Sequence, residues 1–175
     1  MNQETEQVVC INIEVIQYRY DGSQRFDRTW DEYKEGFGDL NKEFWLGNEK
    51  IRRLTEDGVF SLLIQIWDSK STKWKAYYQN FSIGNSSMNY ALQSAGFSGS
   101  AGDGLGCLQG QHFSVCGPDL DAHSPLCTDL SWGGWWVGSC HEVNLNGLYS
   151  TSGGNLSWMS HHTLMKTQMK LTPYI

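Results

Sequence analysis

The sequence predicts a single domain that mixes short helices with an antiparallel sheet and then continues as a long loop-rich region. Three observations support this fold class. Helix-capping residues occur twice in the first third of the chain, apolar and polar residues alternate from position 60 to position 66, and regular periodicity ends near position 98. The length of 175 residues is enough for one core that buries about two-thirds of the unfolded surface.

The first elements follow from local signals. Residues 15–20 have the composition of a strand, and the Asp-Gly pair at 21–22 predicts a turn. Thr29 and Glu32 have the spacing of a capping box. We therefore expect a short helix that begins after Thr29 and ends at Gly36.

A second helix and a meander are expected next. Asn48 is the predicted N-cap of this helix, and Gly58 follows its end. Residues 60–66 have one strongly apolar face, which predicts a strand. Further strands are expected at 74–83 and 88–97, so the middle of the chain should be an antiparallel meander. Residues 98–162 are rich in Gly, Ser and Trp and should be mostly loops, which commonly carry binding sites.

Charge and hydropathy exclude several classes of partner. The net charge of −6 argues against binding to nucleic acid or an anionic membrane, because the sequence shows no basic patch to offset the repulsion. The basic cluster at positions 50, 52 and 53 is expected to be a solvated helix face. No apolar run approaches the ~20 residues of a membrane span, so no insertion is expected. Residues 1–7 are polar and acidic and lack the features of a secretory signal.

Motifs that would indicate catalysis are not found. A G-x-S-x-G elbow fails at its last position, because Ser100 stands where the second glycine is needed. His141 and Glu142 do not extend to an H-E-x-x-H zinc motif. We therefore expect a protein that is not an enzyme.

Two carboxylates and one histidine are candidate functional groups. Asp119 and Asp121 flank one residue in an irregular Gly- and Pro-containing segment, where they could converge on a hard cation such as calcium. The alternative is a polar turn, in which Asp bonds its own backbone. His141 fits either a binding-pocket imidazole or a histidine packed on Trp136. Trp132, Trp135 and Trp136 themselves are expected in the core.

Cysteines and sequons suggest an extracellular protein. The pairs Cys127–Cys140 and Cys107–Cys116 would each close a short loop, worth roughly 3 kcal/mol, but pairing four of the five cysteines allows 15 arrangements that the sequence leaves open. Cys10 would then remain. Candidate N-glycosylation sequons begin at three positions, Asn80, Asn85 and Asn155.

A series of motifs in a fixed order resembles the fibrinogen-related domain family, which includes ficolins, tenascins, angiopoietins and angiopoietin-like proteins. These motifs lie at 15–17, 21–23, 26–38, 43–51, 77–81, 97–103, 112–114, 135–136, 140–141, 144–147 and 169–173. The resemblance implies an α+β fold like the fibrinogen C-terminal domain: a twisted antiparallel sheet with short helices and a loop-rich calcium- and ligand-binding subdomain. Sheet and helices should occupy 15–97, the loop region 98–162 and a closing strand 163–173, with 1–14 a reduced first subdomain.

The resemblance also implies site residues. Asp119 and Asp121 match the two calcium carboxylates, and the carbonyls of His123 and Pro125 match the backbone ligands. Cys127–Cys140 matches the family disulfide. Pro125 replaces a flexible residue of the family pattern and fixes φ near −65°, so we expect a weakened calcium loop.

The function implied is recognition. We expect a secreted, extracellular domain, displayed by a larger oligomeric parent, that acts as an angiopoietin-like ligand of a cell-surface receptor or a matrix protein. The first alternative is a ficolin-like lectin that reads acetylated glycans, although Ser131 stands where acetyl-binding members often carry a pocket Tyr. The second alternative is a structural matrix or assembly module. The expected ligand-binding residues are Trp136, Ser139, Cys140, His141 and Tyr149.

Overall fold

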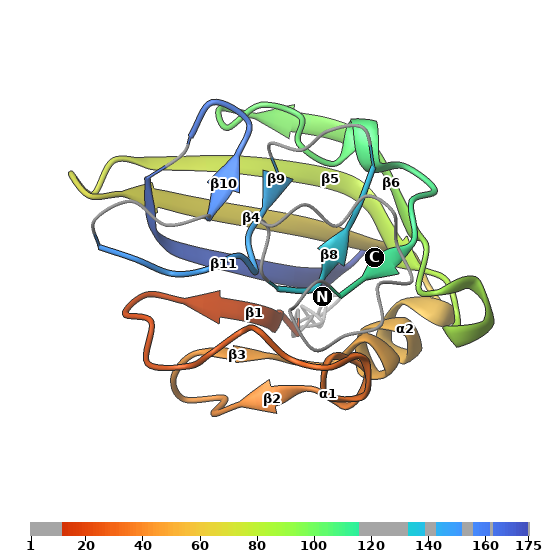
Figure 1. Ribbon diagram of the computed structural model, residues 1–175. Helices are drawn as coiled ribbons and strands as arrows, with labels where there is room; N and C mark the ends of the chain where they lie inside the picture. The colour runs from red at the N-terminus through yellow and green to blue at the C-terminus, as the bar shows by residue number, and fades with distance from the viewer. Residues whose placement is uncertain (1–11, 116–132, 139–142, 152–155, 162, 175) are drawn as a thin grey trace, which may run out of the picture.

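The computed structural model describes residues 12–115, 133–138, 143–151, 156–161 and 163–174. A seven-stranded antiparallel sheet dominates it, in the order β2-β3-β1-β11-β4-β5-β6 (Figure 1). The strands of this sheet are β1 (Glu14–Arg19), β2 (Phe37–Gly38), β3 (Phe44–Trp45), β4 (Phe60–Asp68), β5 (Lys73–Ile83), β6 (Leu92–Gly99) and β11 (Leu164–Pro173). The remaining elements are the helices α1 (Trp30–Glu35) and α2 (Asn48–Glu56), the 3₁₀ turns η1 (Ser86–Met88) and η2 (Gly106–Leu108), and the short strands β7 (Phe113–Ser114), β8 (Trp135–Trp136), β9 (Val143–Asn144) and β10 (Ser157–Trp158).

The sheet confirms the predicted α+β fold class. The expected meander is the hairpin series β4-β5-β6, and the first and closing strands are β1 and β11. The closing strand does not lie at an edge: β11 pairs with β1 on one side and with β4 on the other. The last strand of the chain therefore joins the N-terminal part of the sheet to the meander.

The first helix begins as its capping sequence predicts. The backbone N–H of Glu32 donates to Thr29 Oγ1 at 3.3 Å, and the backbone N–H of Thr29 donates to Glu32 Oε2 at 2.9 Å. Two backbone donors at the start of the helix are thus satisfied, and Gly36 ends the helix with a positive φ of 92°.

The predicted cap of the second helix is wrong. Gly47 is the N-cap of α2, and Asn48 is already its first helical residue. The Asn48 side chain is buried, and its Oδ1 accepts a hydrogen bond from Trp45 Nε1 at 3.0 Å. A tertiary contact, rather than the helix end, therefore uses this amide.

The third strand of the meander begins later than predicted, at Leu92 instead of position 88. Asn85 caps η1 by accepting from the backbone N–H of Met88, and Asn89 and Tyr90 follow in the left-handed region with φ of 46° and 49°. This compact turn occupies the residues that were expected to extend the strand.

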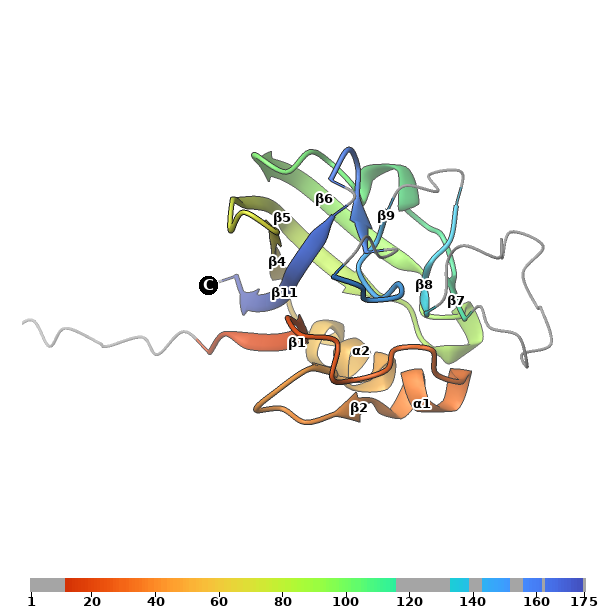
Figure 2. The same ribbon diagram turned by 60° about the vertical axis from the view of Figure 1, so that its left-hand side comes forward.

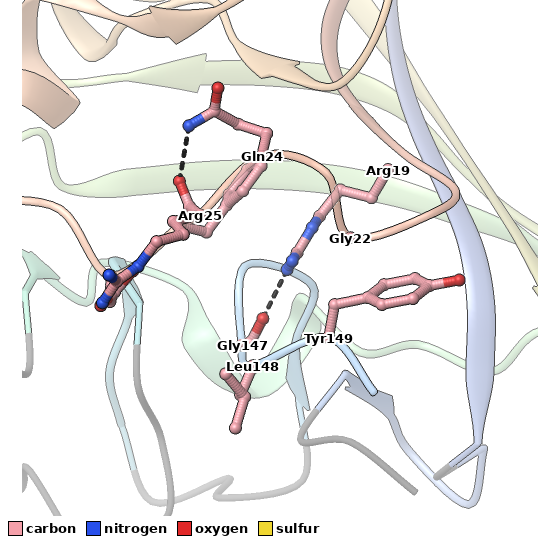
Figure 3. A pocket seen from close by; sticks show the side chains of 9 residues that line it. Arg19, Gly22, Gln24, Arg25, Gly147, Leu148 and Tyr149 are labelled. Atoms are coloured by element: carbon pink, nitrogen blue, oxygen red, sulfur yellow. Dashed lines mark hydrogen bonds and ion pairs between the residues drawn. The ribbon is translucent and has the colours of Figure 1, made fainter. Parts of the chain in front are cut away.

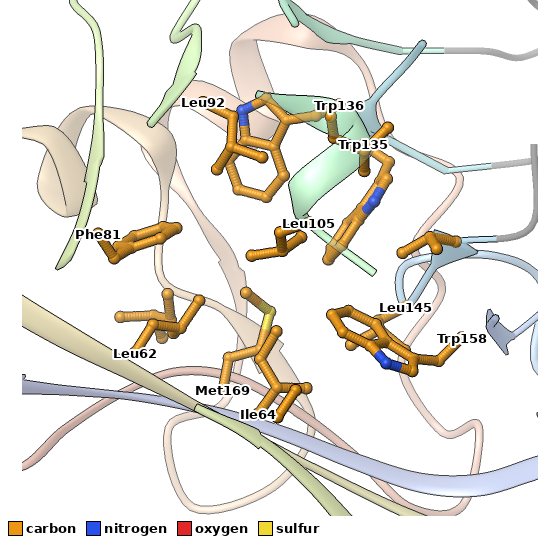
Figure 4. Packing of buried hydrophobic residues seen from close by; sticks show 14 of the residues in the cluster. Leu62, Ile64, Phe81, Leu92, Leu105, Trp135, Trp136, Leu145, Trp158 and Met169 are labelled. Carbon is orange, nitrogen blue, oxygen red and sulfur yellow. The ribbon is translucent and has the colours of Figure 1, made fainter. Parts of the chain in front are cut away.

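The core lies between the sheet and the short strands β7–β10, which cover one of its faces (Figures 1 and 2). Figure 4 shows the two layers meeting, with three tryptophans of the loop region above apolar side chains of β4 and β11. The tryptophans are Trp135, Trp136 and Trp158, and the sheet residues are Leu62, Ile64 and Met169, all fully buried. The loop-rich half of the protein thus folds onto the sheet through its aromatic residues, which bury large apolar surfaces.

Candidate functional site

Residues 133–138 and 143–149 are here called the loop platform. They adjoin positions 116–132, which include the predicted calcium residues, and positions 139–142, which include Ser139, Cys140 and His141. The platform is built on buried residues. Trp135 and Trp136 form β8 and pair with β7, while residues 143–147 are buried as well. Gly133 has a φ of 112°, and a Cβ there would lie 2.1 Å from the Asn146 carbonyl oxygen. Only glycine allows this close approach of the two platform segments.

Buried polar side chains of the sheet hold the platform. Gln17 Nε2 donates to the Leu145 carbonyl at 2.9 Å and to Asn146 Oδ1 at 3.2 Å. Gln17 Oε1 in turn accepts from Thr167 Oγ1 at 2.9 Å. Asn146 Nδ2 donates to the Gly134 carbonyl at 2.9 Å. Strands β1 and β11 are therefore tied to the platform by satisfied hydrogen bonds, which give it one defined position.

Arg19 extends this connection. It is 1% exposed, and its Nη1 donates to the carbonyls of Gly147 and Leu145. Its guanidinium carbon lies 4.0 Å from the centroid of the Phe26 ring, a cation–π distance. Burial lowers the pKa of the Arg19 guanidinium to about 10. Within the described part of the protein it pairs with no carboxylate, and its Nε has no hydrogen-bond partner.

A buried carboxylate shapes the neighbouring turn. Glu43 Oε1 accepts from the backbone N–H groups of Tyr20, Asp21 and Gly22, and Oε2 accepts from that of Gln24. The distances run from 2.6 to 3.1 Å. Four backbone donors therefore converge on one side chain and fix residues 20–24.

A pocket of about 260 Å³ opens between this turn and the platform. Figure 3 shows the side chains of Arg19 and Tyr149 at its wall, with the Arg19 guanidinium directed at Gly147. The Tyr149 hydroxyl lies 2.9 Å from the Tyr20 carbonyl oxygen and 3.1 Å from that of Met165, and donates its one proton to either. The lining residues are Arg19, Gly22, Gln24, Arg25, Phe26, Asp27, Gly147, Leu148 and Tyr149.

The pocket combines three kinds of surface. Leu148 is 54% exposed, so it offers an apolar contact at the rim. Arg25 and Asp27 form an ion pair there, with the Arg25 side chain largely in water. A Cβ on Gly22 would lie 2.5 Å from the Tyr149 ring, so the glycine permits the close packing of turn and ring. Such a mixed apolar and charged pocket can receive a side chain of a partner.

The predicted ligand-binding residues are distributed unequally. Tyr149 lines the pocket, as a ligand-binding role requires. Trp136 is 1% exposed, and its Nε1 donates to the Tyr90 carbonyl at 2.8 Å. Its ring has no free face, which corrects the expectation that it contacts a ligand: Trp136 is a core residue. Ser139, Cys140 and His141 lie outside the described residues.

The other predicted site residues are mostly outside the described part. This holds for the calcium residues Asp119, Asp121, His123 and Pro125, for Cys116, Cys127 and Cys140, and for Asn155. Cys107 is disulfide-bonded. Asn80 and Asn85 are exposed, as a glycosylation acceptor must be.

Arg19 and Glu43 were not singled out from the sequence, although Arg19 had a usable signal. Arg19 lies two residues after Gln17, on the buried side of a strand, where a polar residue requires a partner. The partner itself lies more than a hundred residues away and could not be named.

The described residues lack two features. They contain no group of three or more His, Cys, Asp or Glu side chains that could hold a metal ion. Within the same residues, no helix has the length and apolarity needed to cross a membrane.

The sequence is similar to a known family model and to known proteins. The family model of the fibrinogen beta and gamma chains, C-terminal globular domain, matches residues 11–174. Techylectin-5A of Tachypleus tridentatus is 36% identical over 160 residues, and angiopoietin-1 of Bos taurus is 41% identical over 142 residues. These alignments cover 86% and 81% of this protein, but only 55% of techylectin-5A and 29% of angiopoietin-1.

A solved structure agrees. The fibrinogen-like globe domain of human ANGPTL2 superposes with a TM-score of 0.82 at 33% identity, covering 92% of this protein and 80% of that domain. The sequence therefore corresponds to most of one globe domain, and it spans about half the length or less of these two curated relatives.

Proposed function

Because the protein belongs to the family of fibrinogen C-terminal globular domains, we propose that it is a non-catalytic, extracellular recognition domain that binds a cell-surface receptor or matrix protein. In this proposal the domain is part of a longer, oligomeric parent. The pocket and the adjoining platform form the contact surface.

The observation that carries the proposal is the way the pocket is held. Its walls come from β1, the 20–27 segment and the platform, and buried hydrogen bonds of Gln17, Arg19 and Glu43 fix all three. A preorganised wall loses little conformational entropy when a partner binds. At the rim, the exposed Leu148 supplies an apolar contact and the Arg25–Asp27 pair supplies a charged one, and protein contacts use both kinds.

The relatives support a protein ligand as the leading hypothesis. Angiopoietin-1 is 41% identical over its aligned residues, and a globe domain of an angiopoietin-like protein has the same fold. A receptor- or matrix-binding role by analogy with these relatives is therefore favoured.

The test is binding of the purified domain to a panel of cell-surface and matrix proteins. We expect saturable binding that Leu148→Asp weakens at least about tenfold, because a buried apolar contact is replaced by an unpaired charge. Leu40→Asp is the matched control, since Leu40 is also exposed but lies between β2 and β3. Equal binding by both variants would exclude the pocket as the contact surface.

A calcium-dependent lectin is the second candidate, favoured by the similarity to techylectin-5A. In it, Asp119 and Asp121 with the carbonyls of His123 and Pro125 would hold calcium beside a sugar site near His141. Retention on an N-acetylated sugar resin in calcium, with elution by EDTA, would select it. Binding to the protein panel without competition by free sugar would select the receptor or matrix ligand.

A further inference from the structure

The second face of the sheet carries a group of lysines. Lys73 and Lys75 lie on β5, and Lys166 and Lys170 lie on β11. Their neighbours along the strands, such as Ala76, Thr167 and Met169, are fully buried, and side chains alternate between the faces of a sheet. The four lysines therefore project from the face opposite to β7–β10, which no other described segment covers (Figure 2).

The strand register brings these lysines together. Lys166 pairs with Trp67 of β4, and Trp67 pairs with Lys73 of β5, so the three residues form one row across three strands. The next row places Lys75 beside Gln65, which pairs with Gln168 of β11. We call Lys73, Lys75, Lys166, Lys170 and Trp67 the lysine face.

Its positive charge is not neutralised by the described residues. The ion pairs among those residues are all made by arginines, and none involves a lysine of this face. The outward positions of β4, β5 and β11 carry no Asp or Glu, and the carboxylate at the start of β1, Glu14, is exposed and pairs with Leu171 rather than with a lysine of the face. Asp68, at the end of β4, accepts from the backbone N–H groups of Lys70 and Thr72. A protein of net charge −6 thus gathers four lysines on one face of its sheet.

Trp67 positions two of the ammonium groups. The Nζ atoms of Lys73 and Lys166 lie 5.0 and 4.8 Å from the centroid of a Trp67 ring, and Lys166 Nζ also lies 5.3 Å from that of Tyr18. These are cation–π distances. Two like charges held around one indole repel each other, and an anion placed between them relieves the repulsion. The two ammonium groups are therefore preorganised to bind an anionic group.

We propose that the lysine face binds a linear sulfated polysaccharide. Lysines two residues apart on a strand are about 7 Å apart, and β5 and β11 are separated by about 10 Å, so the charges repeat over a flat area. An extended polymer with repeating anionic groups matches this arrangement. Lysine ammonium groups act as point charges and need no fixed approach angle, which suits sulfate groups on a polysaccharide.

An acidic protein fits the face less well. Protein interfaces depend on a few buried apolar or aromatic anchors. None of the exposed large hydrophobic side chains of the described residues belongs to β4, β5 or β11, and Lys73 and Lys166 lie over the Trp67 ring. The outward residues Leu63, Trp67 and Tyr77 are only partly exposed, whereas Lys73 and Lys75 are exposed, so the face offers charge more than apolar area, which favours a polyanion.

This site is separate from the pocket of the proposed function. It lies on the other face of the sheet and contains no carboxylate, so it needs no calcium. Binding should therefore persist in EDTA and in a Leu148→Asp variant. Failure of one site would leave the other unaffected.

The test is surface plasmon resonance on immobilised heparin in EDTA, at several salt concentrations. We expect wild-type binding that weakens steeply with salt, and a Lys73→Ala/Lys166→Ala variant that binds at least about tenfold more weakly with a shallower salt dependence. Lys34→Ala/Lys42→Ala is the control of equal charge change, with Lys34 in the last turn of α1 and Lys42 between β2 and β3, and should stay within about twofold of wild type.

Competition identifies the ligand class, with melting curves to show that each variant is folded. Soluble heparin should compete, and desulfated heparin, polyglutamate and single-stranded DNA should compete far less. Trp67→Leu keeps all four lysines and should weaken binding, because it removes the indole ring that positions Lys73 and Lys166. The proposal is overturned if folded wild type does not bind heparin, if the two double variants are equally affected, or if polyglutamate or DNA competes as well as heparin.

Discussion

Glu43 holds the turn that forms one wall of the pocket, and its two oxygens accept four backbone N–H groups. In Glu43→Gln one acceptor oxygen becomes an NH₂ group that faces backbone donors. We expect the free energy of unfolding to fall by about 2 kcal/mol, because buried donors lose a charged acceptor. Urea denaturation measures the change.

Glu35→Gln is the matched control for this substitution. Glu35 is exposed at the end of α1, so the same chemical change should alter stability by less than about 0.5 kcal/mol. A Glu43→Gln protein as stable as this control would show that water replaces the carboxylate in the turn.

The distance in sequence between hydrogen-bond partners explains which residues could be predicted from the sequence. Thr29 and Glu32 lie three residues apart, so their sequence spacing was sufficient. Arg19 bonds carbonyls at 145 and 147, and no local pattern connects these positions. Tyr149 is therefore the one residue lining the pocket that the sequence had singled out, and its ligand-binding role stays a prediction.

At the scale of elements, α1 depends on its capping box. Thr29→Ala removes the side-chain acceptor for the Glu32 N–H and should cost about 1 kcal/mol. For a domain of this size the melting temperature should fall by about 2–4 °C. Thr29→Ser, which keeps the hydroxyl, should recover most of the loss, and a Ser variant as unstable as the Ala variant would contradict a capping role.

The capping box also predicts a pH dependence. The backbone N–H of Thr29 donates to the Glu32 carboxylate and lowers its pKa below the ordinary value of 4.5. A carboxylate with a lowered folded-state pKa stabilises the protein above its ordinary pKa, and this stabilisation is lost as the pH falls through the folded-state value. The stability difference between wild type and Glu32→Gln should therefore shrink below about pH 4.5. If this stability difference stays constant from pH 7 to pH 3, the charge of Glu32 does not contribute to the capping box.

Element boundaries differed from prediction where tertiary contacts use a capping residue. Asn48 has the side chain of an N-cap, but Trp45 occupies its oxygen, so the helix begins one residue earlier from Gly47. The start of β6 moved because Asn85 caps a turn that the apolar pattern from position 88 does not reveal. Apolar periodicity predicts which face of an element is buried. It does not predict the residue at which the element begins.

At the scale of the whole molecule, the lysine face shows why a net charge is a poor guide to a surface. The expectation from the sequence that no basic patch exists was wrong. Lys73 and Lys166 are far apart in sequence and share a face only because β11 returns to lie beside β4. The resemblance to a known family predicted the fold, but the surface charges belong to this protein.

The position of β11 makes folding of the sheet depend on residues 164–173. β11 pairs with β1 through partners such as Tyr18 and Gln168, and with β4 along its full length. We expect a variant truncated after residue 163 to lose cooperative unfolding, because β1 and the meander would have no common strand and Leu171 and Met169 would leave the core. A variant truncated after residue 173 keeps β11 and is the control. Thermal melting followed by near-ultraviolet circular dichroism distinguishes them, and a cooperative transition in the shorter variant would show that the two parts of the sheet fold without the strand that joins them.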